Sequence, residues 1–592
     1  MNMLLIALIT LIARVGAAQQ PGASIEGVVV KLGTGEPLAN ANVQLNLEDS
    51  QDRRSESAER ADSARPREDF HRTAKSDTNG RFIFANVAPG NYRLIATYEG
   101  GYVPAEYGQR SPTGQGINFE IAAGQKMTGI QLAMPPTGSI SGRVYDRDGE
   151  PLENAQVMAM RSLYKNGRRT LTIVQAVATD DRGEYRLFWL APGRYYVSAK
   201  PDIAKVAANM GQPNSYNAAA VHITPPMRFG TFEQATGPSV TTRRLKTGNV
   251  VEEMYLPAYY PGTRDPQAAA PISVAAGAAV GGVDLAADIG LVRPHHIQGR
   301  VIDRATGQPV AQTTVSAVPR TIDPYFTIAT ALSNIQGLFD IAGVPAGSYQ
   351  IFARTRAGEG LRVLTGVSSA EMADKDIENL SIVVTSEFKL SGRFIMEGGS
   401  RSFPGIASLI RDPPVLGMAG GGLSFNPPAA AEGSFTVEGI VPGDFRVTLQ
   451  RVPPDSYIKS MRLGNADILN DGLHISGPPE GLLEIVIGAS AGKIEGSVVN
   501  ARQQLLSNRT VVLVPDLRLR QRTDLYKIVS TDNTGRFRMQ GVTPGEYKLF
   551  AWDDVEAGAW QDPAFISTYE NAGRSIHINE GTNENIQLPV IP

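Results

Sequence analysis

The chain has 592 residues, of which 19% are charged and 42% hydrophobic, and its formal net charge is −3. This balance excludes a disordered chain, the length predicts several domains at roughly 100–200 residues each, and the near-neutral charge without a long basic stripe gives no reason to expect nucleic acid as a partner. Cysteine is absent, which excludes disulfides, thiolate zinc sites, a cysteine nucleophile and a lipid anchor on an N-terminal cysteine.

The N-terminus has most features of an export signal. Residues 4–13 form an apolar run, broken only by Thr10, that is too short to span a bilayer. Small residues at positions 15–18 offer a cleavage site, although no basic residue precedes the run and Arg14 follows it. We therefore expect a signal peptide over residues 1–18, export to an extracellular, periplasmic or outer-surface location, and no membrane span after cleavage.

Five repeats follow, and each opens with a strand that carries a glycine near its centre. Such a glycine marks a bulge or a close approach of another backbone. In the first three repeats a Gly-x-Pro turn then leads into a second strand, whereas this turn is indistinct in the last two. The opening strands are expected at residues 25–29, 140–144, 297–301, 390–394 and 494–498.

A glycine-framed strand is the most regular part of each repeat. Alternating apolar residues between two turn residues predict a half-buried β-strand, and the aromatic residue after the second glycine predicts a tyrosine corner. The first glycines are Gly80, Gly183, Gly337, Gly433 and Gly535, the second are Gly90, Gly193, Gly347, Gly443 and Gly545, and the aromatic residues are Tyr92, Tyr195, Tyr349, Phe445 and Tyr547.

About seven short strands per ~100 residues, without helical periodicity, are typical of a Greek-key β-sandwich. The predicted fold is therefore all-β, with about five sandwiches of prealbumin-like or immunoglobulin-like type in series. The expected ranges are 19–135 with a charged insertion at 48–74, 136–292 with an insertion at about 201–250, 293–386, 387–490 (divergent) and 491–592.

These repeated phrases together resemble the carboxypeptidase regulatory-like domain. The resemblance implies a transthyretin-like sandwich related to the B-type repeats of Gram-positive adhesins. It covers most of the mature chain, is weaker in the fourth repeat, and extends to large secreted or envelope proteins of soil bacteria. The family's domain is an accessory to catalytic domains, so the resemblance implies no catalytic residues.

The sequence offers no catalytic, cofactor-binding or metal-binding set. Of six histidines, only His577 is followed by a glutamate at the spacing His-x-x-Glu, and residues three apart on a strand face opposite sides. The neighbouring His295 and His296 also face opposite sides of an extended chain. We therefore expect no metal site, no cofactor and no enzymatic activity.

Other polar positions have competing interpretations. Acidic residues before the first framing glycine, such as Asp77 and Asp532, could bind calcium, but ordinary turns through side-chain bonds to backbone are favoured. A Lys–Asn isopeptide crosslink, known in the related adhesin repeats, is not favoured in the first repeat, because no asparagine in its final strand matches Lys31 and Glu99.

The tryptophans are the candidates for ligand contact. Trp552 and Trp560 flank an acidic loop, so they are candidate carbohydrate contacts, although loop tryptophans also fold back on the edge of a sandwich. Trp189 lies in an alternating strand and is expected to be half-buried.

The predicted function is a non-enzymatic, secreted, multi-domain scaffold or adhesin. The alternative is a carbohydrate- or peptide-binding envelope protein that uses loops at one end of the sandwiches. A third hypothesis, an enzyme built on the second repeat's insertion, has no residues to nominate. The expected partners are cell-surface polysaccharide or another envelope protein.

Overall fold

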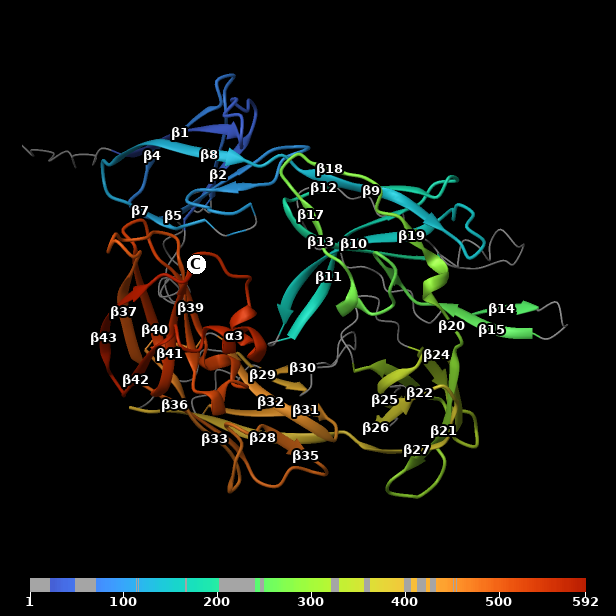
Figure 1. Cartoon of the computed structure of the whole chain (residues 1–592). Coiled ribbons are helices and arrows are strands. Elements are labelled where there is room, and N and C mark those ends of the chain that lie inside the picture. Colours follow the sequence, from blue (N-terminus) through green and yellow to red (C-terminus); the bar gives the residue numbers. More distant parts are fainter. Residues whose placement is uncertain are drawn as a thin grey trace, which may run out of the picture. The chain divides into compact units, whose positions relative to one another are not determined.

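The computed structural model describes residues 22–47, 71–112, 114, 116–165, 168–201, 240–244, 250–320, 329–355, 363–398, 406–411, 422–425, 433–450, 452, 453 and 455–592. Over these residues the chain is built mainly of β-strands, which gather around five main hydrophobic cores (Figure 1). The prediction of an all-β chain of about five tandem sandwiches is confirmed. We number the sandwiches 1 to 5 in chain order.

Two compact units contain the five sandwiches. Sandwich 1 belongs to the unit that ends at Pro136, and sandwiches 2 to 5 belong to the unit that begins at Thr137. The expected signal peptide and most of the two expected insertions lie outside the described residues. The domain boundaries themselves stay predictions.

Sandwich 1 shows the arrangement that recurs along the chain. Its two sheets have the strand orders β4-β1-β8 and β3-β2-β5-β6, with β7 also paired to β5. The strands are β1 (Ala23–Lys31), β2 (Asn42–Leu47), β3 (His71–Lys75), β4 (Arg81–Val87), β5 (Gly90–Thr97), β6 (Ala105–Glu106), β7 (Phe119–Ile121) and β8 (Lys126–Met134). Because β3 begins at His71, the last residues of the expected charged insertion form a strand, which corrects that expectation.

Sandwich 2 has the sheets β12-β9-β18 and β11-β10-β13-β16, with β19 also paired to β9 and β17 to β13. Its elements are β9 (Gly138–Tyr145), β10 (Ala155–Lys165), β11 (Arg168–Ala178), β12 (Glu184–Leu190), β13 (Gly193–Pro201), β14 (Val240–Arg244), β15 (Val250–Tyr255), β16 (Ala258–Tyr259), η2 (Pro266–Ala268), β17 (Ile272–Val274), β18 (Ala279–Val280), β19 (Leu285–Ala286), η3 (Ala287–Gly290) and β20 (Leu291–Val292). The end of the expected second insertion is not a loop, because β14 pairs with β15 and β15 pairs with β20.

Sandwiches 3 and 4 differ in how their sheets are joined. In sandwich 3 the pairing of β26 with β27 joins the strands into one continuous sheet, with the order β23-β22-β25-β26-β27-β21-β24. Sandwich 4 has two separate sheets, β31-β28-β36-β33-β34 and β30-β29-β32-β35. The strands of sandwich 3 are β21 (His295–Asp303), β22 (Thr313–Pro319), β23 (Ala329–Leu332), β24 (Leu338–Val344), β25 (Gly347–Thr355), β26 (Leu364–Met372) and β27 (Ile377–Ser386). Those of sandwich 4 are β28 (Phe388–Met396), β29 (Ile406–Arg411), β30 (Gly422–Phe425), β31 (Ser434–Ile440), β32 (Gly443–Gln450), β33 (Tyr457–Leu463), β34 (Ala466–Asp467), β35 (Leu473–Ile475) and β36 (Leu483–Gly488).

Sandwich 5 returns to two sheets, β40-β37-β43 and β39-β38-β41-β42. Its elements are β37 (Gly492–Val499), β38 (Thr510–Pro515), η4 (Leu517–Leu519), η5 (Thr523–Leu525), β39 (Lys527–Ser530), β40 (Arg536–Val542), β41 (Gly545–Trp552), η6 (Ala559–Gln561), α3 (Pro563–Tyr569), β42 (Arg574–Ile578) and β43 (Asn583–Pro589). In all five sandwiches the opening strand pairs in parallel with a closing strand and antiparallel with the glycine-framed strand.

The repeated glycines explain why these strands recur. The first framing glycine has a positive φ in every repeat, for example 73° at Gly80 and 78° at Gly535, a conformation that other residues rarely adopt. The glycine inside the opening strand makes room instead. A Cβ on Gly27 would lie 2.6 Å from both the Ile130 carbonyl oxygen and the Phe82 ring, which confirms the predicted close approach.

Candidate functional site

The aromatic residues after the Pro-Gly turn are buried and serve the turn itself. Each tyrosine hydroxyl donates a hydrogen bond to the carbonyl four residues earlier, which confirms the predicted tyrosine corner. The donor–acceptor pairs are Tyr92–Ala88 (2.9 Å), Tyr195–Ala191 (2.5 Å), Tyr349–Pro345 (2.8 Å) and Tyr547–Thr543 (2.8 Å).

The fourth repeat has a phenylalanine at this position, and an arginine packs on its ring. The Arg411 guanidinium lies 5.1 Å from the centroid of the Phe445 ring, and its Nη2 donates to the Pro442 carbonyl at 3.2 Å. Burial lowers the pKa of Arg411 from its ordinary value. This bond goes to the carbonyl three residues before the ring, whereas the tyrosines bond to the carbonyl four residues before. In sandwich 2 the Arg161 guanidinium likewise lies 5.6 Å from the centroid of the Tyr195 ring, so a cation over this ring also occurs where the hydroxyl is present.

The acidic residues considered for calcium hold turns. One carboxylate oxygen of Asp77 accepts hydrogen bonds from the backbone N–H groups of Asn79 and Arg81, both at 2.8 Å. Asp180, Asn334 and Asp532 make the same pair of bonds in repeats two, three and five. An asparagine can do this as well as an aspartate, so the turn interpretation is confirmed.

Both tryptophans considered for carbohydrate contact are buried. Trp552 is 1% exposed and Trp560 is 7% exposed. They belong to a second core of sandwich 5, in which Phe550 stacks on Trp552 with ring centroids 5.1 Å apart. Neither ring offers a free face to a sugar, so the structure corrects the ligand interpretation and favours the alternative that these rings fold back on the sandwich.

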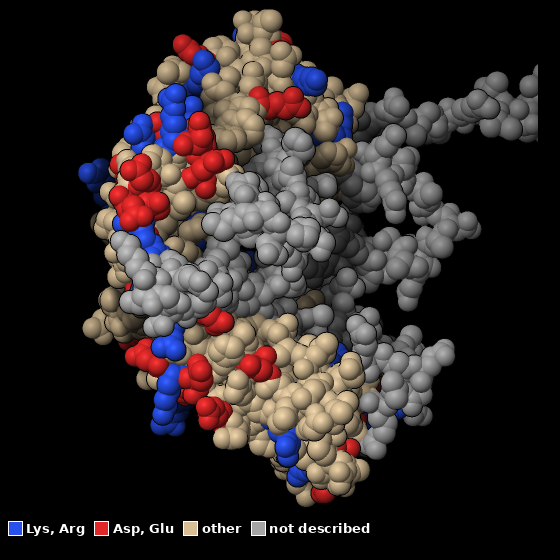
Figure 2. Space-filling view, turned by 90° about the vertical axis from the view of Figure 1, so that its right-hand side faces the viewer, with Lys and Arg blue, Asp and Glu red and all other residues tan. Residues whose placement is uncertain are grey.

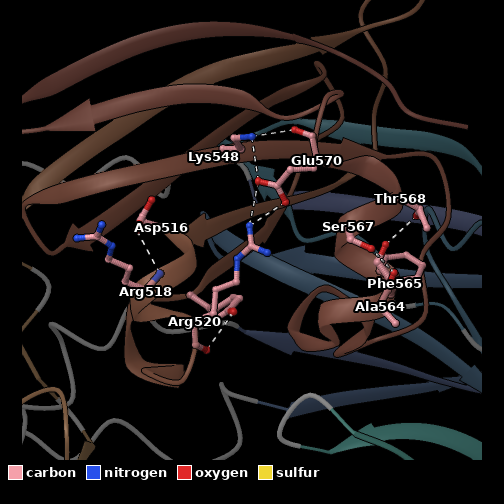
Figure 3. Close-up of polar contacts among 10 residues, drawn as sticks. Asp516, Arg518, Arg520, Lys548, Ala564, Phe565, Ser567, Thr568 and Glu570 are labelled. Atoms are coloured by element: carbon pink, nitrogen blue, oxygen red, sulfur yellow. Dashed lines mark hydrogen bonds and ion pairs between the residues drawn. The ribbon is translucent and has the colours of Figure 1, made fainter.

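Helix α3 covers this second core and is held by an ionic network (Figure 3). Glu570, at the end of α3, accepts hydrogen bonds from Arg520 at 2.8 and 3.0 Å, and its carboxylate lies 2.9 Å from Lys548 Nζ. Burial acts to raise the pKa of Glu570, but the bonds from Lys548 and Arg520 outweigh it, and the pKa lies below its ordinary value. This helix was not predicted from the sequence, although Asp562 before Pro563 is a helix-start signal.

His577, the histidine of the His-x-x-Glu spacing, is paired with a carboxylate outside that spacing. His577 Nδ1 lies 2.6 Å from Glu546, and this hydrogen bond raises the pKa of His577. Glu580, the other half of the His-x-x-Glu spacing, bonds instead to Tyr457 and Lys459 of sandwich 4. The structure therefore does not bring His577 and Glu580 together.

His296 lies in a second carboxylate cluster. Its Nδ1 is 2.7 Å from Asp340 and its Nε2 is 3.6 Å from Glu252. The hydrogen bond with Asp340 is the main cause that raises the pKa of His296. His295 is buried nearby with its Nδ1 3.3 Å from Asp376, which also accepts a hydrogen bond from the backbone N–H of His296. The two imidazole rings therefore have different partners.

Lys31, the crosslink candidate, makes an exposed ion pair with Glu36 at 2.6 Å, which raises the pKa of the lysine. The Lys31 amine, which an isopeptide crosslink would use, is thus engaged in an ordinary salt bridge. Within the described ranges, no three His, Asp or Glu side chains are grouped so that they could hold a metal ion.

A cavity of about 270 Å³ lies between sandwiches 4 and 5. Arg522 lines it, but its Nη2 is 2.6 Å from Asp524 Oδ2 and its Nη1 is 3.3 Å from Asn470 Oδ1. No histidine and no serine lines this cavity, so it holds no pair of nucleophile and histidine base.

On the face shown in Figure 2, acidic and basic side chains are mixed and form no patch of one sign. Such a surface lacks the electrostatic signature of nucleic-acid binding. The described part of the chain contains no helix long and apolar enough to cross a membrane.

Two segments of the chain match the model of one protein family. Residues 24–126 and 139–218 match the model of the carboxypeptidase regulatory-like domain, which confirms the resemblance for the first two repeats. No curated protein matches the chain.

Several solved structures share local similarity with the chain. The minor pilin of Streptococcus agalactiae is 13% identical over 45% of this chain and 95% of its own, with a TM-score of 0.21. A streptococcal ancillary pilin is 12% identical over 51% and 100% (TM-score 0.19), and the major pilin subunit of Bacillus cereus is 10% identical over 62% and 99% (TM-score 0.13). Similarity this low assigns no function. The chain is therefore a tandem β-sandwich protein in which two segments match the carboxypeptidase regulatory-like domain.

Proposed function

We propose that this chain is a non-enzymatic, exported scaffold of adhesin type, in which sandwiches in series carry surfaces that contact other molecules. One observation carries the proposal. The polar groups that recur from repeat to repeat, the tyrosine hydroxyls and the Asx side chains, are bonded to the backbone of their own turns. The residues that are repeated therefore build the domains and leave function to positions where the repeats differ.

Two further observations support the proposal. The matched domain is a non-catalytic fold, and the apolar run at residues 4–13 is typical of an exported chain. The partners that we propose are a cell-surface polysaccharide or another envelope protein, because the mixed surface charge in Figure 2 favours no strongly charged partner.

Localisation and attachment in the source organism test the proposal. Antibodies raised against the full chain should label intact cells, and deletion of the gene should reduce attachment of cells to surfaces or to other cells. Labelling only after the cells are broken, or unchanged attachment in the deletion strain, would overturn it. Turnover by the purified full chain in a broad hydrolase screen would refute the non-enzymatic part.

A further inference from the structure

Two neighbouring positions on the glycine-framed strand set sandwich 2 apart. They are the fifth and sixth residues after the first framing glycine. The pairs in repeats one to five are Ala85–Asn86, Phe188–Trp189, Ala342–Gly343, Glu438–Gly439 and Gln540–Gly541. Only sandwich 2 has aromatic rings at either position.

Trp189 occupies a backbone conformation that disfavours a large side chain. Its φ is +55°, and the equivalent Gly343 and Gly541 have φ of +75° and +65°. A bulky residue in this left-handed region is an outlier, and such strain clusters at functional sites. Burial of the ring offsets this backbone cost only in part, because Trp189 is 43% exposed.

The two rings form an exposed corner. The pairing of β12 with β9 shifts register between Leu187 and Leu190, so Phe188 and Trp189 lie in a bulge. Phe188 is 37% exposed, and the two ring centroids are 4.9 Å apart with planes at 78°. A ligand therefore meets two nearly perpendicular aromatic surfaces on one edge strand.

Polar groups flank this corner, and Arg143, Glu184 and Arg186 together carry a net charge of one positive unit. Arg186 is exposed two residues before Phe188, on the same face of β12, and lies opposite Ser141 of β9. On the same face, Arg143 forms an ion pair with Glu184. The surroundings thus offer the Arg186 guanidinium and the Ser141 hydroxyl for hydrogen bonds, and the charge of Arg143 is neutralised by Glu184.

Strand β11, which lies beside the bulge, holds a buried polar group without a hydrogen-bond partner among the described residues. In sandwich 1, Arg72 of β3 donates to the carbonyls of Ala85 and Asn86 in the equivalent bulge. The strand register places Gln175 of β11 at the position of Arg72. Gln175 is buried, and its Oε1 has no hydrogen-bond partner among the described residues. The strained Trp189 of β12 and the unpaired acceptor of Gln175 on β11 therefore lie on two strands that contact each other.

We propose that Phe188 and Trp189 bind a neutral polysaccharide, with the C–H face of a pyranose ring stacked on Trp189 and ring hydroxyls bonded to Arg186 and Ser141. Flat aromatic surfaces beside hydroxyl and guanidinium groups match a ligand with an apolar face and a hydroxyl rim. A peptide that adds a strand to β12 fits less well, because the bulge interrupts the backbone ladder at this point. The inference rests on the proposed adhesin function and specifies its ligand.

Binding of the full chain to four neutral polysaccharides, laminarin, xylan, galactomannan and dextran, tests the inference. At least one should bind, Trp189→Gly should weaken it tenfold or more, and Phe188→Ala should weaken it severalfold. Ile83→Ala is the matched control, because Ile83 is an exposed residue of the equivalent strand β4, and it should bind as the wild type does. No binding to any of the four, or equal binding by Trp189→Gly, would overturn the inference, as would a protein ligand that depends on Trp189.

Quenching of tryptophan fluorescence provides a readout on the unmodified chain. Of the three tryptophans, only Trp189 is exposed, so iodide should quench its emission selectively. The bound polysaccharide should protect that emission, and quenching that is unchanged at saturation would contradict stacking on Trp189. If binding fails while the surface labelling and attachment described above persist, only the ligand assignment is lost. If the labelling fails, the proposed function itself is refuted.

Discussion

Replacement of Trp189 by alanine and by glycine should reverse the usual order of stability of these two residues. Both variants lose the indole ring, so the difference between them isolates the backbone. Alanine at φ +55° is destabilised by roughly 1–2 kcal/mol in the left-handed conformation, whereas glycine loses ~0.5–1 kcal/mol more chain entropy on folding. We therefore expect the glycine variant to be more stable than the alanine variant by about 0.5–1 kcal/mol.

Native-state hydrogen–deuterium exchange of the full chain measures this difference locally, in peptides that cover β9 and β12. The glycine variant should exchange about two- to fivefold more slowly than the alanine variant, as the free-energy difference requires. The same two substitutions at Phe188, whose φ is not positive, are the control and should show the ordinary order, with alanine more stable. Equal exchange at Trp189, or slower exchange in the alanine variant, would refute the strain argument.

Three further predictions follow from the corners and the histidine cluster. Tyr547→Phe removes the bond to Thr543 and should destabilise sandwich 5 by about 1 kcal/mol, seen as faster exchange in β41; unchanged exchange would contradict this role. Arg411→Met leaves a turn carbonyl unpaired and should destabilise sandwich 4 by about 1–3 kcal/mol; a shift of melting confined to other sandwiches would argue against it. Asp340 raises the pKa of His296, so the bond between protonated His296 and Asp340 should stabilise sandwich 3 fully below about pH 6.5 and be lost as pH rises through the raised pKa. Hydrogen exchange in β21 should follow this pH dependence, and His296→Gln should abolish it.

Local patterns were sufficient for most of the fold. The alternation of Phe82 and Phe84 between two glycines predicts a strand wherever it occurs, because a strand's side-chain period is a local property. The elements that were missed lack such patterns. Strand β14 pairs with β15 and β15 pairs with β20, and β3 lies in a polar segment that forms a strand because it pairs with β2.

The candidate site could not be predicted in the same way. The sequence places Trp552 and Trp560 beside an acidic loop, but helix α3 closes over them and buries both rings. It places Trp189 in a regular strand, but a bulge turns the backbone to positive φ and leaves the ring exposed. Exposure depends on what packs against a residue from elsewhere in the chain, which the residue's own neighbours in sequence do not specify.

The sequence by itself therefore determined most of the strands, the repeated turns and the approximate number of sandwiches, since glycine, proline and period-two alternation act within a few residues. Only the tertiary structure decided which aromatic rings meet solvent. It also showed that Arg411 bonds to the turn before Phe445 and that His577 and Glu580 have different partners. Those outcomes depend on contacts between segments far apart in sequence, where the packing of one strand against another fixes each side chain's surroundings.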